Sequence, residues 1–330
     1  MRKGLIFLAL IAALVIVSAI SLKTGAVAIP FPRLWAVFSG DGGSGDETIA
    51  SIILKIRLPR LLLALLVGGA LSTAGVLFQG LFRNPLVEPY TLGVSGGAAL
   101  GVSLAVLLGR IVPRFLLPLF GFAGAGFAVL LAYAIARRKF LKISYLLLVG
   151  VMLSFISSSL IMLLMSVSTL SQFRTMIFWS MGSLELADPA LLALTAAIIL
   201  LAAGVSWTRA LSLNAFALGE EGAAALGIRL EREKTVIFLL GSLLAGSAVA
   251  AAGVVGFVGL LVPHFTRLLI GNDHRYLLPA SFLAGAAFLA ACDTLARVLL
   301  SPAELPVGVI TGVLGGIAFI AVLGKKQQKL

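Results

Sequence analysis

The chain has 330 residues, of which 60% are hydrophobic and only 12% are charged. A soluble domain carries about 25% charged residues, so this chain lacks the polar side chains needed to cover a water-soluble globule. Its formal net charge is +12, but the basic residues lie in short turns and form no basic domain. This distribution argues against a nucleic-acid-binding protein and in favour of a membrane protein.

Apolar stretches, most of them 17 to 25 residues long, follow one another along the chain. A helix needs about 20 residues to cross a hydrocarbon core. The pattern predicts an all-α polytopic membrane protein of about ten transmembrane helices, forming a single domain over residues 1–330. The expected spans are 4–22, 61–82, 91–109, 115–136, 143–166, 190–208, 235–252, 254–270, 277–299 and 306–324.

The first span resembles a signal peptide. Its apolar run to Ile20 exceeds the usual length of about 7 to 15 residues, so we expect it to be retained as a helix.

Residues 235–270 form one apolar run that is too long for a single span. Gly253 and Gly256 predict a tight turn within it, which leaves a short eighth helix that is not a full crossing.

The positions of Lys and Arg predict the orientation. With the N-terminus in the cytoplasm and ten spans, sixteen of the 25 basic residues lie inside and nine outside. Cytoplasmic loops of membrane proteins carry the excess of basic residues, so both termini are expected in the cytoplasm. Nine outer charges are more than orientation requires, which suggests that some of them have a function.

Glycines recur every fourth residue in two spans, at 93, 97 and 101 and at 308, 312 and 316. Small residues on one helical face allow two helices to approach closely within a membrane. We expect the first set to serve packing inside one subunit. For the second set, a seam between two subunits and the wall of a pore both remain open.

The longest inner loop covers residues 209–234. Gly219 followed by Glu220 and Glu221 predicts a helix start, because acidic side chains favour the positive end of the helix dipole. Gly227 is suited to end that helix. A short cytoplasmic helix of this kind is either a contact for a partner protein or a turn on the membrane surface.

Polar residues at the two faces are candidates for function. Arg57, Arg60 and Arg297 are expected on the outer side, where basic residues are disfavoured, so they are candidates for docking an acidic partner. Asp293 lies four residues before Arg297 and is expected to pair with it. Glu304 opens the tenth span, and we expect it to have a structural role. On the inner side, Asn84 and Glu88 lie in a proline-stiffened turn and are expected to face protein or water.

Several chemistries find no support in the sequence. The single cysteine excludes an intrachain disulfide, and the two histidines lie too far apart for a metal site. Carboxylates are nearly absent deep in the spans, and no phosphate-binding loop of the G-x-x-x-x-G-K-[ST] type is present. An active transporter of this composition must therefore take its energy from another polypeptide.

Several ordered motifs over almost the whole chain resemble the permease family of ABC importers for iron-siderophore, haem and cobalamin. The motifs are Arg57-Leu58-Pro59-Arg60, residues 79–89 with Arg83-Asn84-Pro85-Leu86, residues 92–98, residues 217–221 with Leu226-Gly227, residues 256–264, residues 273–275 and residues 303–308. The resemblance implies a permease that works as a homodimer or beside a similar permease. It also implies two cytoplasmic ABC ATPase subunits and an extracytoplasmic substrate-binding protein, in the cytoplasmic (inner) membrane of a prokaryote.

The resemblance also assigns roles to residues. Docking of the binding protein falls to the three outer arginines. Coupling to the ATPase corresponds to residues 218–227, with Leu218, Gly219, Glu220, Glu221, Leu226 and Gly227. An inner gate corresponds to Asn84, Leu86, Ile143 and Ser144, although the turn that begins at Lys142 departs from the small polar residues expected there.

The implied mechanism is alternating access driven by the ATPase. No metal or cofactor is expected on this chain, because ATP and magnesium would bind the ATPase. An importer of oxyanions such as molybdate or tungstate and a stand-alone secondary carrier remain as alternatives, and the sequence does not specify the substrate.

Overall fold

The computed structural model describes residues 2–25, 27–39, 47–109, 113–137, 143–185, 188–301 and 303–327. Within these ranges all regular secondary structure is helical. Seven helices are long and apolar enough to cross a membrane, and three shorter apolar helices accompany them in the part of the chain that the structure describes. The predicted all-α polytopic architecture is therefore confirmed.

Each expected span corresponds to one apolar helix. These helices are α1 (Arg2–Lys23), α4 (Leu58–Phe82), α5 (Val94–Leu107), α6 (Leu117–Arg137), α7 (Ile143–Ser166), α9 (Pro189–Thr208), α12 (Leu230–Ala252), α13 (Val258–Ile270), α14 (His274–Val298) and α15 (Val307–Gln327). Short helices lie in the connections: α2 (Phe31–Ser39), α3 (Glu47–Ser51), α8 (Leu170–Ser180), α10 (Ala210–Phe216) and α11 (Glu220–Ala225), with a π-helix at Ile52–Arg57 and 3-10 turns at Pro89–Leu92 and Arg114–Leu116.

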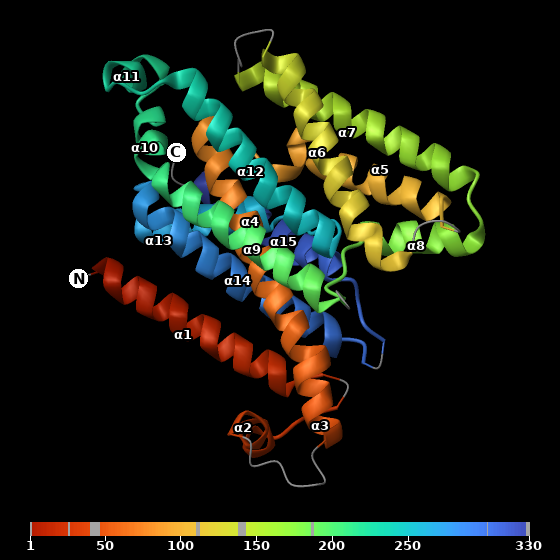
Figure 1. Cartoon of the computed structure of the whole chain (residues 1–330). Helices are drawn as coiled ribbons and strands as arrows, with labels where there is room; N and C mark the ends of the chain where they lie inside the picture. The colour runs from red at the N-terminus through yellow and green to blue at the C-terminus, as the bar shows by residue number, and fades with distance from the viewer. Residues whose placement is uncertain are drawn as a thin grey trace.

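Helix α4 forms the centre of the bundle, where it packs against α14, α12, α13 and α9 (Figure 1). From Val67 to Gln79 every residue of α4 is buried. By contrast, α1, α7 and α9 leave most of their apolar surface exposed, and in a bilayer this surface contacts lipid. The N-terminus, α10, α11 and the end of α15 lie at one end of the bundle, and α2, α3 and α8 lie at the other (Figure 1).

Glycines bring α5 and α6 into direct backbone contact. A Cβ at Gly97 would lie 2.5 Å from the carbonyl oxygen of Gly124, and one at Gly101 would lie 2.3 Å from the carbonyl oxygen of Phe120. The expected packing within one subunit is thus confirmed for these two glycines. Gly93 does not belong to that face, because its φ of 81° places it before α5 as a left-handed break.

The starts of the second and third spans differ from those expected. The third span begins at Val94 and not at residue 91, because left-handed Gly93 separates the 3-10 turn from α5. The second span extends outward through the π-helix, so that helical structure is continuous over Glu47–Phe82. Pro59, near the start of α4, lacks an N–H group, and the wider π-turn before it is a common way to accommodate such an interruption of the helical ladder.

The predicted turn between the seventh and eighth spans is confirmed. Helix α12 ends at Gly253, which has a φ of 69°, and the short α13 begins after Phe257, which has a φ of 67°. A left-handed conformation is costly for a phenylalanine, so the surrounding contacts must hold it there. The eighth helix starts at Val258 and not at residue 254, and it is only 13 residues long.

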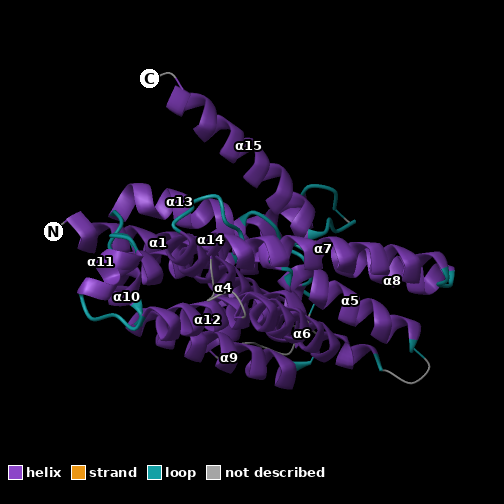
Figure 2. Ribbon diagram, turned by 90° about the horizontal axis from the view of Figure 1, so that it is seen from above, coloured by secondary structure: helices purple, strands orange, loops and turns teal. Residues whose placement is uncertain are grey.

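Helix α15 projects away from the rest of the bundle (Figure 2). Its first turn is held closely, since a Cβ at Gly308 would lie 2.3 Å from the carbonyl oxygen of Met181. Further along, a Cβ at Gly312 would have no described atom within 4 Å. One face of this helix is therefore free within a single chain.

Candidate functional site

A buried ion-pair cluster lies at the outer end of the bundle. Asp293 on α14 accepts hydrogen bonds from Arg60 Nε at 2.9 Å and from Arg297 Nε at 3.1 Å. Arg60 Nη1 also lies 2.6 Å from a carboxylate oxygen of Glu304, which supports the expected structural role of Glu304. The predicted pairing of Asp293 with Arg297 is confirmed, and the cluster joins α4, α14 and the segment before α15.

Two of the arginines also hold the end of α1. Arg57 Nη1 donates to the carbonyl oxygens of Leu22 at 2.7 Å and Lys23 at 3.0 Å, and Arg57 Nη2 donates to that of Val27. Arg297 donates to the carbonyl oxygens of Ser21 at 3.1 Å and Thr24 at 2.9 Å. Both arginine residues are buried, whereas the side chain of Arg60 is 14% exposed. The arginines thus have an internal structural role, and docking of a partner by them stays a prediction.

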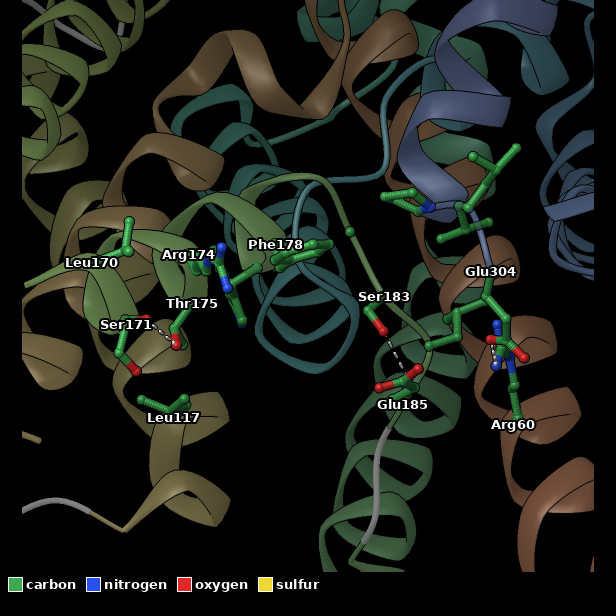
Figure 3. A pocket seen from close by; sticks show the side chains of 16 residues that line it. Arg60, Leu117, Leu170, Ser171, Arg174, Thr175, Phe178, Ser183, Glu185 and Glu304 are labelled. Carbon is green, nitrogen blue, oxygen red and sulfur yellow. Dashed lines mark hydrogen bonds and ion pairs between the residues drawn. The ribbon is translucent and has the colours of Figure 1, made fainter. Parts of the chain in front are cut away.

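A hollow of about 980 Å³ opens beside this cluster. It lies between α8 on one side and the segment before α9, together with Arg60 and Glu304, on the other (Figure 3). Charged and aromatic side chains face each other across it, with Arg174 and Phe178 on α8 and Glu185 opposite (Figure 3). Its volume is at the upper end of the range for small-molecule sites, which is about 300 to 1,000 Å³.

The inner loop folds into α11, as expected, and into a second short helix, α10, that the sequence did not predict. Gly219, with a φ of 96°, precedes α11, so the predicted helix start is confirmed. Gly227, with a φ of 81°, ends it: its N–H donates to Ala224 O at 2.9 Å, and the N–H of Ile228 donates to Ala223 O at 3.1 Å. These two bonds form a Schellman motif. Leu218 and Leu226, which flank the short helix, are both exposed.

An amide on α10 ties this loop to α14. Asn214 Nδ2 donates to Asp273 Oδ1 at 2.9 Å, and Asn214 Oδ1 accepts the backbone N–H of His274 at 2.9 Å. The same oxygen lies 2.7 Å from His274 Nδ1. A hydrogen bond from Arg275, followed by the one from Asn214, holds the pKa of Asp273 well below its usual value, so this carboxylate stays ionised.

The contact between Asn214 and His274 also lies against α4. A Cβ at Gly80 would lie 3.0 Å from His274 Nε2 and 2.9 Å from Cδ2 of Leu213 on α10. Gly80 is three residues before the end of α4 at Arg83. Asn214 and His274 thus form part of a continuous chain of contacts from the cytoplasmic loop to the turn after α4.

A second tether connects α11 to α12. Lys234 Nζ lies 2.7 Å from a carboxylate oxygen of Glu220, and the lysine side chain is only 7% exposed. Arg209 and Glu233 form a further ion pair at 3.1 Å. The cytoplasmic loop is therefore held on both sides, by α14 through Asn214 and by α12 through these ion pairs.

The predicted inner gate residues lie at two helix ends. Asn84 and Leu86 are exposed in the turn after α4, where Asn84 Oδ1 accepts the N–H of Leu86 at 2.9 Å. Ile143 and Ser144 begin α7, and Lys142 lies outside the described residues. A role for these residues in a gate stays a prediction.

Two buried polar contacts were not assigned from the sequence. Glu88 Oε1 accepts the N–H of left-handed Phe257 at 2.6 Å, which confirms that Glu88 faces protein and places its carboxylate at the start of α13. Gln79 donates to the carbonyl oxygens of Gly259 and Leu260 and accepts from Arg267 at 3.2 Å. In the sequence, only the presence of polar Gln79 within an apolar span indicates that this side chain makes a polar contact.

The hollow was not predicted from the sequence. Arg174, on its wall, is one of the nine basic residues expected on the outer side, and the excess of these residues is the signal in the sequence that points to the hollow. Among the described residues no cluster of three His, Cys, Asp or Glu that could hold a metal ion is present.

Comparison with known proteins places this architecture in one class, the permease subunits of ABC transporters. The chain belongs to the FecCD transport family, which matches residues 13–325. It is 39% identical over 321 residues to the hemin transport system permease protein HmuU of Yersinia pestis, covering 96% of this chain and 94% of that protein. It is 42% identical over 277 residues to the vitamin B12 import system permease protein BtuC of Escherichia coli O9:H4 (strain HS), covering 84% of each.

Solved structures agree with this assignment. A chain described as an inward-facing conformation of an ABC transporter assigned to the metal-chelate type superposes with a TM-score of 0.85 at 32% identity, covering 98% of this chain and 99% of that chain. PsaBC from Streptococcus pneumoniae, solved with a Fab, gives a TM-score of 0.56 at 20% identity over 84% of this chain and 94% of that one, which shows a shared fold alone.

Proposed function

We propose that this chain is the translocation subunit of an ABC importer that carries a metal chelate, such as iron-siderophore, haem or cobalamin, into the cytoplasm. The observation that carries the proposal is the near full-length similarity to permeases named for hemin and for vitamin B12. Both cargoes are bulky metal chelates, and the outer hollow of about 980 Å³ offers an entrance of suitable size.

The proposal includes partners that the chain itself does not contain. Two copies, or this chain and a similar permease, would enclose the pathway, and the free face of α15 (Figure 2) supports its use at that seam or along the pathway. Two ABC ATPases would bind α10 and α11 and supply ATP and magnesium, so this chain would carry no cofactor. An extracytoplasmic binding protein would deliver the chelate at the outer face of a prokaryotic inner membrane.

The tethers of the cytoplasmic loop support a mechanism of alternating access. ATP-driven movement of α11 is transmitted to α12 through Lys234 and Glu220 and to α14 and α4 through Asn214 and His274. Because α4 ends at the turn that contains Asn84 and Leu86, its displacement moves that turn at the inner face. During this movement, the ion-pair cluster around Asp293 holds the outer ends of α4 and α14 together.

Reconstitution of the complete transporter tests the function. Proteoliposomes that contain the permease, its ATPase and internal ATP, with the binding protein outside, are given radiolabelled ferric siderophore, haem, cobalamin or molybdate. We expect concentrative uptake of one metal chelate that stops when ATP is replaced by a non-hydrolysable analogue. Uptake of molybdate alone, or gradient-driven uptake by the permease without the ATPase, would contradict the proposal.

Docking requires a separate test, because all three arginines also make internal contacts. Arg60→Gln removes the most accessible of the three charges, and Glu304→Gln is the control that disturbs the same ion pair from its other side. We expect Arg60→Gln, unlike Glu304→Gln, to weaken binding of the purified binding protein in surface plasmon resonance. If both variants and the unchanged protein bind the binding protein with equal affinity, Arg60 is not part of the docking site.

A further inference from the structure

Helix α2 carries a stripe of exposed aromatic residues. Phe31, Trp35 and Phe38 are 48%, 75% and 52% exposed. Their spacing of four and then three residues places them on one face of the helix. Large aromatic side chains gathered in one stripe are unusual on a surface that faces water, where contiguous apolar patches mark interaction sites.

The helix is held firmly in place by its other apolar side. Leu34 is buried, and Val37 packs against the core. The connection before α2 is fixed by Arg57, which donates to the carbonyl oxygens of Lys23 and Val27. The aromatic stripe is therefore presented in a defined direction and is not part of a loose loop.

The position of α2 matches the boundary of the bilayer. Helix α1 is seen along its length in Figure 1, and α2 lies almost end-on beside its outer end, across the direction of the spanning helices. Lys23, the last residue of α1, places its Nζ 4.8 Å from the centre of the Phe31 ring. A basic residue that ends a span and aromatic rings at the same level are typical of the membrane–water interface.

The surface beside the stripe is apolar. One face of α1 is exposed, with Leu5, Leu8 and Ile16 more than half exposed. On its other face, Ile6, Phe7 and Leu10 pack against the core. We expect lipid to cover the exposed face in a membrane, so that α2 continues a lipid-facing surface at the interface. Arg33, which is exposed, lies on the opposite side of α2 from the aromatic stripe, where it can reach water.

We propose that α2 is an interfacial helix that inserts Phe31, Trp35 and Phe38 into the headgroup region of the outer leaflet. The partner of this surface is the lipid bilayer itself. Such a helix lies in the plane of the membrane with its apolar side buried about 5–10 Å into the headgroup and acyl boundary. It would set the depth at which α1 and the outer ends of α4 and α14 stand in the bilayer.

Spin-label accessibility tests the proposal on the assembled transporter in liposomes. Nitroxide labels are attached through Trp35→Cys, Phe38→Cys and the control Arg33→Cys, each in a Cys292→Ala background so that the only native cysteine is absent. Collision rates are then measured with oxygen, which concentrates in lipid, and with a water-soluble nickel chelate. We expect the ratio of oxygen to nickel collisions to be several-fold higher at positions 35 and 38 than at position 33.

A second measurement keeps the native aromatic stripe intact. With Trp179→Phe and Trp207→Phe, Trp35 is the only tryptophan of the three in the chain, and its fluorescence is followed in liposomes of brominated phosphatidylcholine. We expect strong quenching by lipids brominated near the headgroup and little by aqueous iodide. Equal nickel accessibility at positions 33 and 35, or quenching of Trp35 by iodide and not by lipid, would overturn the proposal. Protection that disappears when each vesicle holds one transporter would instead assign the stripe to a contact between two transporters and would also overturn the proposal.

Discussion

Asp293 and Arg297, one turn apart on α14, form a buried ion pair in which Arg297 Nε lies 3.1 Å from Asp293 Oδ2. The other carboxylate oxygen of Asp293 accepts a hydrogen bond from Arg60 at 2.9 Å. One carboxylate thus serves two guanidinium groups, and the end of α1 is attached to the same cluster through Arg297. The outer ends of three helices therefore depend on one aspartate.

Removing this carboxylate should destabilise the protein strongly. In Asp293→Asn, Arg60 and Arg297 lose the anion that compensates their buried charge, which costs about 3–5 kcal/mol for a broken buried pair. The measurement is the thermal unfolding midpoint of the detergent-solubilised permease. Glu304→Gln, which breaks only the half-exposed pair of Arg60, should cost no more than about 1 kcal/mol. Equal midpoints for the two variants would contradict this assignment.

The close approach of α5 and α6 depends on the absence of side chains. Gly97→Ala would place a methyl group 2.5 Å from the carbonyl oxygen of Gly124, and we expect overpacking to cost about 1–3 kcal/mol. Gly126→Ala, on the same helix as Gly124, is the matched control, because its methyl group would have no described atom within 4 Å. Thermal unfolding should distinguish the two; a Gly97→Ala protein as stable as Gly126→Ala would show that the helices can separate at little cost.

Asn214→Ala should uncouple ATP hydrolysis from transport. The variant loses the bonds to Asp273 and His274, so movement of α10 and α11 is no longer passed to α14. The measurement is the number of ATP molecules hydrolysed per chelate imported, which should rise while the ATPase rate changes little. Gln172→Ala removes an amide that makes comparable contacts at the outer end and should leave this ratio unchanged; a rise in both variants would indicate a general loss of structure.

The ion pair of α11 with α12 should matter more than charge on α11 in general. Glu220→Gln leaves the buried ammonium group of Lys234 without its partner, whereas Glu221 makes no ion pair within the described part of the chain. We expect the ATP cost of uptake to increase for Glu220→Gln and to stay unchanged for Glu221→Gln. Similar effects of both variants would mean that α11 acts through its overall charge on the ATPase and not through Lys234.

The outer hollow should lie on the route of the chelate. Ser183→Cys in a Cys292→Ala background places a reactive thiol on the wall of the hollow, where a bulky maleimide would obstruct entry. Uptake should fall after labelling while binding-protein affinity is retained. Ser166→Cys, at the end of α7 and not among the lining residues of the hollow, is the control; unimpaired uptake in labelled Ser183→Cys would exclude the hollow from the route.

The sequence by itself predicted those features of this protein that depend on local interactions within one helix. The length of the apolar runs predicted every spanning helix, because crossing hydrocarbon requires a hydrogen-bonded backbone of fixed minimum length. The start of α11 at Gly219 and the pairing of Asp293 with Arg297 followed from rules that act within one helix, namely the helix dipole and the spacing of one turn.

Only the tertiary structure decided which distant residues meet. Arg60 reaches Asp293 across 233 positions, and Asn214 reaches His274 across 60. Whether Gly93 continued the helix of Gly97 and Gly101 or interrupted it was likewise undecided, because glycine accepts both conformations. The apolar lengths specify how many helices cross the bilayer, but lipid gives them no order, and the pairing of helices is set by close packing and buried polar contacts between segments remote in the chain.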